Sequence, residues 1–468
     1  MARNLTQWID KIRADGAEYY DLDRQIDPAA FEASAWMEGL ERNGSFAAVR
    51  FTNAKNLRGE PSEYALLMNT FATEKKIGVA LEAGRFDRKS IMSLYAERET
   101  RARPVEKVAA SAAPTKETIW HGDDVDLRRL PIPRLNEMDG APYLTPAVVA
   151  KDRETGRYNL SWNRAMYLDE THLGIWMSPR HLWSLHRAAE GVGAGLPVAL
   201  VLGHHPGFYL TAAALTKLDR DEYEVAGGIM GEPVRVTASE SFGDELLVPA
   251  DAEVVIEAEI LPDRRCIEGP FGEFTGYEGP QRLAWVLEAK AVTARREATM
   301  LCVFGSHRDN LFAHYPIQAS VFSSLKSVFP RVKDISWVDA GVPLQLVISM
   351  EKATEGEPAR VAMHAMSLSN FFKHVIVVDE DIDPGDLRQV MWAVATRVQA
   401  DRDVGIIRNV QAQVLDPSLE TEISGATMII DATKPSGRTF SVRAQPPEEV
   451  VERVGRAMRE WQRQVGTA

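Results

Sequence analysis

The chain has 468 residues, of which 45% are hydrophobic and 26% charged, a balance typical of a globular protein with a buried core. It carries 54 Lys and Arg against 67 Asp and Glu, a formal net charge of −13, which argues against binding nucleic acid or an anionic membrane surface. Two cysteines, Cys266 and Cys302, exclude a disulfide scaffold or a cysteine-based zinc site and indicate a reducing, cytoplasmic location.

Residues 1–115 are predicted to form a mixed α/β domain. Trp8, Ile9 and Ile12 share one face of an amphipathic helix, and residues 45–51 are typical of a strand. The first residues carry charges throughout and lack the apolar region of a signal peptide, and no uninterrupted apolar run is long enough for a membrane span. The segment 101–118 has two prolines and few large apolar residues, so we expect a linker there.

Residues 116–305 are strand-rich, and their spacing predicts a barrel or sandwich interrupted by a helix over 181–192. The β-prone segments are 145–152, 157–168, 173–179, 197–203, 233–239, 251–261 and 283–295. Residues 306–468 change to an α/β pattern. Its expected strands are 333–341, 344–351, 374–382 and 404–415, and its expected helices are 359–370, 385–398 and 446–465. The sequence therefore predicts an α+β multidomain protein.

The segment 266–280 holds three glutamates, Glu268, Glu273 and Glu278, among glycines, prolines and aromatic residues. Carboxylates held together in a partly dry pocket raise one another's pKa, and one of them then becomes a usable proton donor. The alternative is a polar hairpin with solvated acids.

Two further clusters carry polar residues of chemical interest. Asn159 and Arg164 lie five positions apart, and a Pro-Arg-His triplet ends at His181. An Asn on a strand and a His at a helix start can supply metal ligands, although capping and core roles are also compatible with the pattern. Glu222 precedes Gly227 and Gly228, where we expect a turn that lets the backbone approach a ligand closely.

In order along the chain, these clusters resemble the motifs of the UbiD family of decarboxylases, from about Asp126 to the C-terminal helix. The matching motifs are Asn159 with Arg164-Ala165-Met166, Pro179-Arg180-His181, Glu222 with Gly227, and Glu268-Gly269-Pro270-Phe271-Gly272-Glu273. The resemblance implies an N-terminal α/β domain, a flavin-binding split β-barrel and a C-terminal α/β domain that mediates dimerisation, or a higher homo-oligomer.

The resemblance also implies the cofactors: prenylated FMN, a divalent metal (Mn²⁺ or Mg²⁺) and K⁺, with a flavin prenyltransferase as supplier of the flavin. By matching position, Asn159, His181 and Glu222 are the expected metal ligands. Arg164, Glu268 and Glu273 are the expected catalytic residues. The expected cofactor-binding set is Asn159, Ser161, Trp162, Asn163, Arg164, Arg180, His181 and Glu222.

The activity implied is reversible, non-oxidative release of CO₂ from an aromatic, heteroaromatic or α,β-unsaturated carboxylic acid. Possible ring contacts are Trp162, Trp176, Phe274 and Tyr277, and possible contacts to a polar substrate group are His307, Arg308 and His314. The alternatives are a redox flavoprotein with ordinary FMN and a non-catalytic scaffold. A scaffold has no need to keep three charges that are costly to bury.

Overall fold

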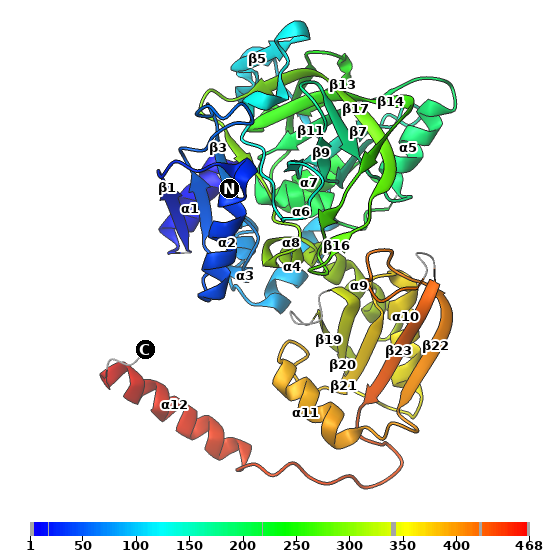
Figure 1. Cartoon of the computed structure of the whole chain (residues 1–468). Helices are drawn as coiled ribbons and strands as arrows, with labels where there is room; N and C mark the ends of the chain where they lie inside the picture. The colour runs from blue at the N-terminus through cyan, green and yellow to red at the C-terminus, as the bar shows by residue number, and fades with distance from the viewer. Residues whose placement is uncertain (1–3, 17, 218, 338–342, 421–423, 466–468) are drawn as a thin grey trace.

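The computed structural model describes residues 4–16, 18–217, 219–337, 343–420 and 424–465. An N-terminal region lies beside a strand-rich central region, a C-terminal α/β region follows, and the last helix stands apart from all three (Figure 1). The α+β multidomain class expected from the sequence is confirmed. No helix in the described ranges is long and apolar enough to cross a membrane.

The N-terminal region packs helices against a four-stranded sheet of order β1-β2-β3-β18. Its elements are α1 (Leu5–Ala14), β1 (Tyr19–Leu22), α2 (Glu32–Arg42), β2 (Ala48–Phe51), β3 (Ala65–Met68), α3 (Glu74–Ala80) and α4 (Arg88–Glu99). Trp8, Ile9 and Ile12 are buried, as their helical spacing predicts. The last strand, β18 (Thr299–Leu301), pairs in parallel with β3, so the chain returns to this sheet after the central region.

The central region is a curled sheet of order β6-β9-β10-β17-β14-β11-β7-β8, with β5 also paired to β17. Its strands are β5 (Thr118–His121), β6 (Tyr143–Leu144), β7 (Ala147–Lys151), β8 (Tyr158–Trp162), β9 (Ala165–Tyr167), β10 (His172–Ile175), β11 (Leu196–Leu202), β14 (Val254–Glu268) and β17 (Arg282–Ala294). The register between β14 and β17 shifts twice, and such irregularities let long strands bend around a core.

Three helices and a small sheet complete this region. The helices are α5 (His181–Glu190), α6 (Pro206–Ala212) and α7 (Glu222–Met230). The small sheet joins β12 (Arg235–Ser239) and β13 (Gly243–Pro249) to β4 (Glu106–Lys107), so the expected linker contributes a short strand.

The turn expected at Gly227 and Gly228 is wrong, because both glycines lie inside α7. A Cβ atom on Gly228 would lie 2.5 Å from the carbonyl oxygen of Arg101. These glycines therefore let the segment after α4 pack closely against α7, and they do not open the backbone to a ligand.

The C-terminal region is a five-stranded sheet of order β19-β20-β21-β23-β22, preceded by α8 (Arg308–Ala313) and α9 (Tyr315–Val328). Its strands are β19 (Val332–Trp337), β20 (Gln345–Met350), β21 (His374–Asp379), β22 (Val404–Gln411) and β23 (Ser424–Ala432), and its helices are α10 (Glu357–Leu368), α11 (Leu387–Arg397) and α12 (Glu448–Val465). The expected elements are confirmed, except that residues 338–341 of the first expected strand lie outside the described residues.

Candidate active site

A cavity of about 560 Å³ lies where the central sheet, the α8–α9 segment and the C-terminal region meet. The central region supplies its polar wall, Asn159 to Arg164 together with Arg180, His181, Glu222 and Glu273. The α8–α9 segment adds Asn310, His314 and Ile317, and the C-terminal region adds Phe371, Gln413 and Leu415. All eight residues of the expected cofactor-binding set line this one cavity.

A buried arginine holds two glutamates at one end of the cavity. Arg164 Nε lies 2.7 Å from Glu268 Oε1, and Nη2 lies 3.0 Å from Glu268 Oε2, so the guanidinium grips this carboxylate with two hydrogen bonds. Arg164 Nη1 donates to Glu273 Oε1. Glu268 is 0% exposed and Glu273 is 7% exposed. The chain thus brings together the three residues that the sequence motifs single out.

The surroundings of these charges differ between the two acids. Burial raises the pKa of Glu273; the nearby Arg164 charge opposes this shift and the Glu268 charge adds to it. Burial acts to lower the pKa of Arg164, but the two carboxylates outweigh it and keep the guanidinium charged. One cation therefore faces two acids, and Glu273, with its single contact to Arg164, is the one suited to carry a proton.

A tyrosine that sequence reasoning missed supports this cluster. The Tyr143 hydroxyl lies 3.2 Å from Glu268 Oε1 and 3.2 Å from the carbonyl oxygen of Pro270. Burial raises the pKa of Tyr143, so its hydroxyl keeps its proton and donates. The strand pairing of Tyr143 with Met166 places it beside Arg164, and no local sequence pattern signals this contact.

We expect Tyr143→Phe to lower turnover by roughly tenfold or more, because a hydrogen bond to a charged group contributes about 1.5–3 kcal/mol. Steady-state decarboxylation measures the effect, and Tyr277→Phe, which changes an exposed tyrosine, is the matched control. A Tyr143→Phe enzyme with the wild-type rate would show that this hydroxyl does not support Glu268.

Asn159, His181 and Glu222 converge elsewhere on the lining of the same cavity. Glu222, the first residue of α7, accepts hydrogen bonds at Oε2 from Asn159 Nδ2, at 2.8 Å, and from the backbone N–H of Leu160. His181 begins α5, and its Nδ1 lies 3.8 Å from Glu222 Oε1. The described residues contain no group of three or more His, Cys, Asp and Glu side chains arranged to hold a metal. The expected metal ligands include two side chains of these types, His181 and Glu222, and the amide of Asn159.

Several polar atoms along this wall are buried without a partner. Within the described chain, Asn159 Oδ1, Ser161 Oγ and Asn163 Oδ1 have no hydrogen-bond partner. Burial lowers the pKa of Arg180, and no described carboxylate offsets that shift. Free oxygen ligands beside an unpaired guanidinium fit a bound anion with its cations, as a flavin phosphate with a divalent metal would require.

Some of the other candidate substrate contacts line the cavity and others lie outside it. Trp162, Trp176 and Phe274 line the cavity, whereas Tyr277 is 63% exposed and does not, so that expectation is wrong. His307 bonds to Glu38 at 2.6 Å, and Arg308 bonds to the carbonyl oxygen of Ala72 at 3.2 Å, so both contact the N-terminal region.

Of the three possible contacts to a polar substrate group, His314 is the one that lines the cavity. Its ring stacks on Trp162 with centroids 5.9 Å apart, and its Nδ1 donates to the carbonyl oxygen of Asn310 at 2.8 Å. Burial lowers the pKa of His314 to about 4, so the ring is neutral near pH 7. Sequence reasoning missed the neighbouring Asn310, Phe371, Gln413 and Leu415, which no motif marks.

Residues 106–307 match the family model described as the 3-octaprenyl-4-hydroxybenzoate carboxy-lyase Rift-related domain, and residues 310–432 match the C-terminal domain of the same carboxy-lyases. The chain belongs to the UbiD family. The fold class and the carboxy-lyase activity expected from the sequence are those of this family.

Relatives of known activity and solved structures are similar to this UbiD-family chain over most of its length. A phenolic acid decarboxylase of Streptomyces sp. (strain D7) is 33% identical, and the match covers 97% of this chain and 98% of that one. The UbiD-class enzyme HmfF from Pelotomaculum thermopropionicum, solved with FMN, is 32% identical with a TM-score of 0.86, covering 95% and 97% of the two chains. An evolved dimeric form of HmfF was solved with prenylated FMN.

A third UbiD-family neighbour has been solved in two arrangements. The vanillic acid decarboxylase of Sedimentibacter hydroxybenzoicus is 26% identical, with a TM-score of 0.86 in a closed form and 0.83 in an open form. Each covers 98% of this chain and 99% of that one.

Proposed function

We propose that this UbiD-family chain is a prenylated-FMN-dependent carboxy-lyase that acts reversibly on an aromatic or heteroaromatic carboxylic acid. The observation that carries the proposal is the buried Arg164, Glu268 and Glu273 cluster at a cavity whose lining also offers unpaired polar atoms. A redox flavoprotein or a scaffold has no evident use for two buried acids around one arginine.

In this proposal Asn159, His181 and Glu222 bind Mn²⁺ or Mg²⁺. Asn159 supplies its unpaired Oδ1, Glu222 a buried carboxylate, and His181 an imidazole, a donor set that suits a hard divalent cation. K⁺ would bind beside the same flavin phosphate, and a flavin prenyltransferase would supply the modified flavin. When bound, the prenylated flavin supplies the electron sink for decarboxylation.

The chain's own residues orient the substrate and handle its proton. Arg164 keeps its charge in a buried site and can orient the substrate carboxylate through its planar guanidinium. Burial raises the pKa of Glu273, which favours its protonated form, and this acid delivers a proton to the carbon that has lost CO₂. Trp162, Phe274 and Phe371 contribute aromatic rings to the cavity lining, which suits the flat ring of an aromatic acid.

A panel of carboxylic acids tests the function. We expect CO₂ release from at least one aromatic or heteroaromatic acid by protein made together with a flavin prenyltransferase, and none by protein made without it. Turnover only of non-aromatic α,β-unsaturated acids would change the substrate class. No turnover across the panel, with the prenylated flavin bound, would favour the scaffold, and reduction of the bound flavin by a nicotinamide would favour the redox alternative.

We also propose a homodimer, or a higher homo-oligomer, held by the C-terminal region (306–468). Helix α12 stands away from the rest of the chain at the end of an extended segment (Figure 1). Val451, Val454, Met458 and Trp461 recur along it at helical spacing and are exposed. A second copy of the chain would bury this apolar stripe.

The cysteines are free, which suits a location in the cytoplasm.

Ending the chain after Arg443 is expected to lower the oligomeric state, because it removes the whole apolar stripe. Light scattering coupled to size-exclusion chromatography measures the change. Arg453→Ala, a change on the same helix that leaves the stripe intact, is the matched control. A truncated chain with the mass of the full-length assembly would show that α12 does not hold the oligomer together.

A further inference from the structure

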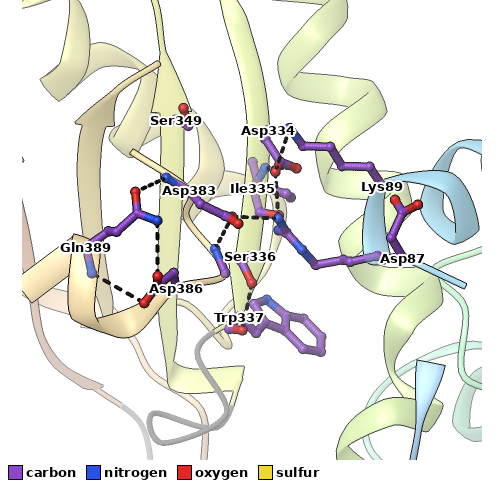
Figure 2. A network of polar contacts seen from close by, with 12 residues as sticks. Asp87, Lys89, Asp334, Ile335, Ser336, Trp337, Ser349, Asp383, Asp386 and Gln389 are labelled. Atoms are coloured by element: carbon purple, nitrogen blue, oxygen red, sulfur yellow. Dashed lines mark hydrogen bonds and ion pairs between the residues drawn. The ribbon is translucent and has the colours of Figure 1, made fainter. Parts of the chain in front are cut away.

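A polar network joins the start of α4, in the N-terminal region, to the C-terminal sheet (Figure 2). Arg88 Nη2 lies 2.6 Å from Asp334 Oδ2, and Arg88 Nη1 donates to the carbonyl oxygen of Ile335. Arg88 Nη2 also lies 3.5 Å from Asp383 Oδ1. Arg88 therefore contacts both β19, at the edge of the sheet, and the loop that follows β21.

The Arg88–Asp334 pair is unlike a surface ion pair, whereas the Asp383 side chain is 58% exposed. The Arg88 side chain is 15% exposed and that of Asp334 is 2% exposed, so solvent screens their attraction poorly. Removing the arginine would leave the buried Asp334 carboxylate with the exposed Lys89, whose Nζ lies 3.4 Å from Oδ2, as its remaining cation.

The loop that carries Asp383 is itself held in place. Asp383 Oδ1 accepts from the backbone N–H of Gly385 at 2.9 Å, and the Gln389 side chain bonds to Asp386 at 3.0 Å and to the Asp383 backbone at 3.3 Å (Figure 2). Asp386 in turn caps α11. Arg88 thus contacts two ordered parts of the C-terminal region, strand β19 and the loop that carries Asp383.

The other end of α4 is tied to the central region. Arg98, in its last turn, donates from Nη1 to the carbonyl oxygen of Ile229 at 3.0 Å. Ile229 belongs to α7, the helix that begins with Glu222. Helix α4 therefore connects the C-terminal sheet, through Arg88, to the helix that carries a proposed metal ligand.

The C-terminal region also completes the cavity, since Phe371, Gln413 and Leu415 line it. We infer that Arg88 is a positioning residue: its contacts with Asp334, Ile335 and Asp383 hold the C-terminal region in the arrangement that closes the cavity. The link between this arrangement and substrate binding rests on the proposed function.

Arg88→Ala tests the inference on the full-length flavin-loaded protein. Without the Arg88 contacts, the arrangement that closes the cavity is less populated. The apparent affinity for the substrate acid falls in proportion to that population. We expect small-angle scattering without substrate to show a larger radius of gyration. We further expect KM for the acid to rise by roughly fivefold or more, with flavin content unchanged. Arg88→Lys, which keeps the charge but loses the planar guanidinium, is expected to shift both quantities less and in the same direction.

Arg331→Ala is the matched control, because Arg331 pairs with Glu357 inside the C-terminal region and its ion pair does not cross to the N-terminal region. Scattering profiles of both Arg88 variants that coincide with the wild type would overturn the inference, as would an equal change in Arg331→Ala. The scattering comparison needs no turnover. A wild type inactive on every acid would count against the proposed function, and the scattering result would still decide the role of Arg88.

Discussion

Glu273→Gln is expected to bind flavin at the wild-type level and to lose turnover by roughly 100-fold or more. The amide keeps the shape of the side chain but cannot donate an acidic proton. Arg164 holds Glu268 through two hydrogen bonds and Glu273 through one, and burial raises the pKa of Glu273. Steady-state decarboxylation, measured beside incorporation of solvent deuterium into the product, reports the lost proton transfer.

The same assignment predicts the pH dependence of the wild type. A donor must be protonated, so the rate should fall as pH rises through the raised pKa of Glu273, and residual turnover of Glu273→Gln should lack this fall. Glu278→Gln, a change of an exposed glutamate in the short strand β16 (Glu278–Gly279), is the control. If Glu273→Gln turns over normally while Glu268→Gln is inactive, the donor is the other glutamate.

Glu222→Ala is expected to lose nearly all of the bound divalent metal and most of the flavin. Glu222 is the buried anion of the proposed metal set, and its Oε2 also fixes the amide of Asn159. Without the cation, the negative charge of the flavin phosphate would lose its compensation. Elemental analysis and flavin absorbance of the purified protein measure both losses without any assay of activity.

His181→Ala should behave in the same way, because it removes a second proposed ligand. Glu224→Ala, a change of the same residue type two positions further along α7, is expected to keep metal and flavin. Full metal and flavin content in both Glu222→Ala and His181→Ala would show that the metal is held elsewhere.

Much of the fold follows from local patterns. Trp8, Ile9 and Ile12 mark a helix that is amphipathic by itself, and the apolar run over 197–202 becomes the buried strand β11. The pattern over 227–228 misleads, because glycines favour turns in isolation, whereas here they permit close packing of α7 against the segment after α4. The spacing of Val451, Val454, Met458 and Trp461 also identifies α12 correctly, but spacing says nothing of what covers it.

The sequence by itself determined the family motifs and hence the residues to examine, since Glu268 and Glu273 stand in one short segment with the chemistry of an acid pair. Only the tertiary structure decided which distant residues complete the site. Tyr143 reaches Glu268 across 125 positions through strand pairing, and Leu415 enters the cavity from the C-terminal region. Arg88 meets Asp334 across 246 positions. Local periodicity reports which face of an element is buried, whereas contacts between elements depend on register and packing, which no short segment encodes.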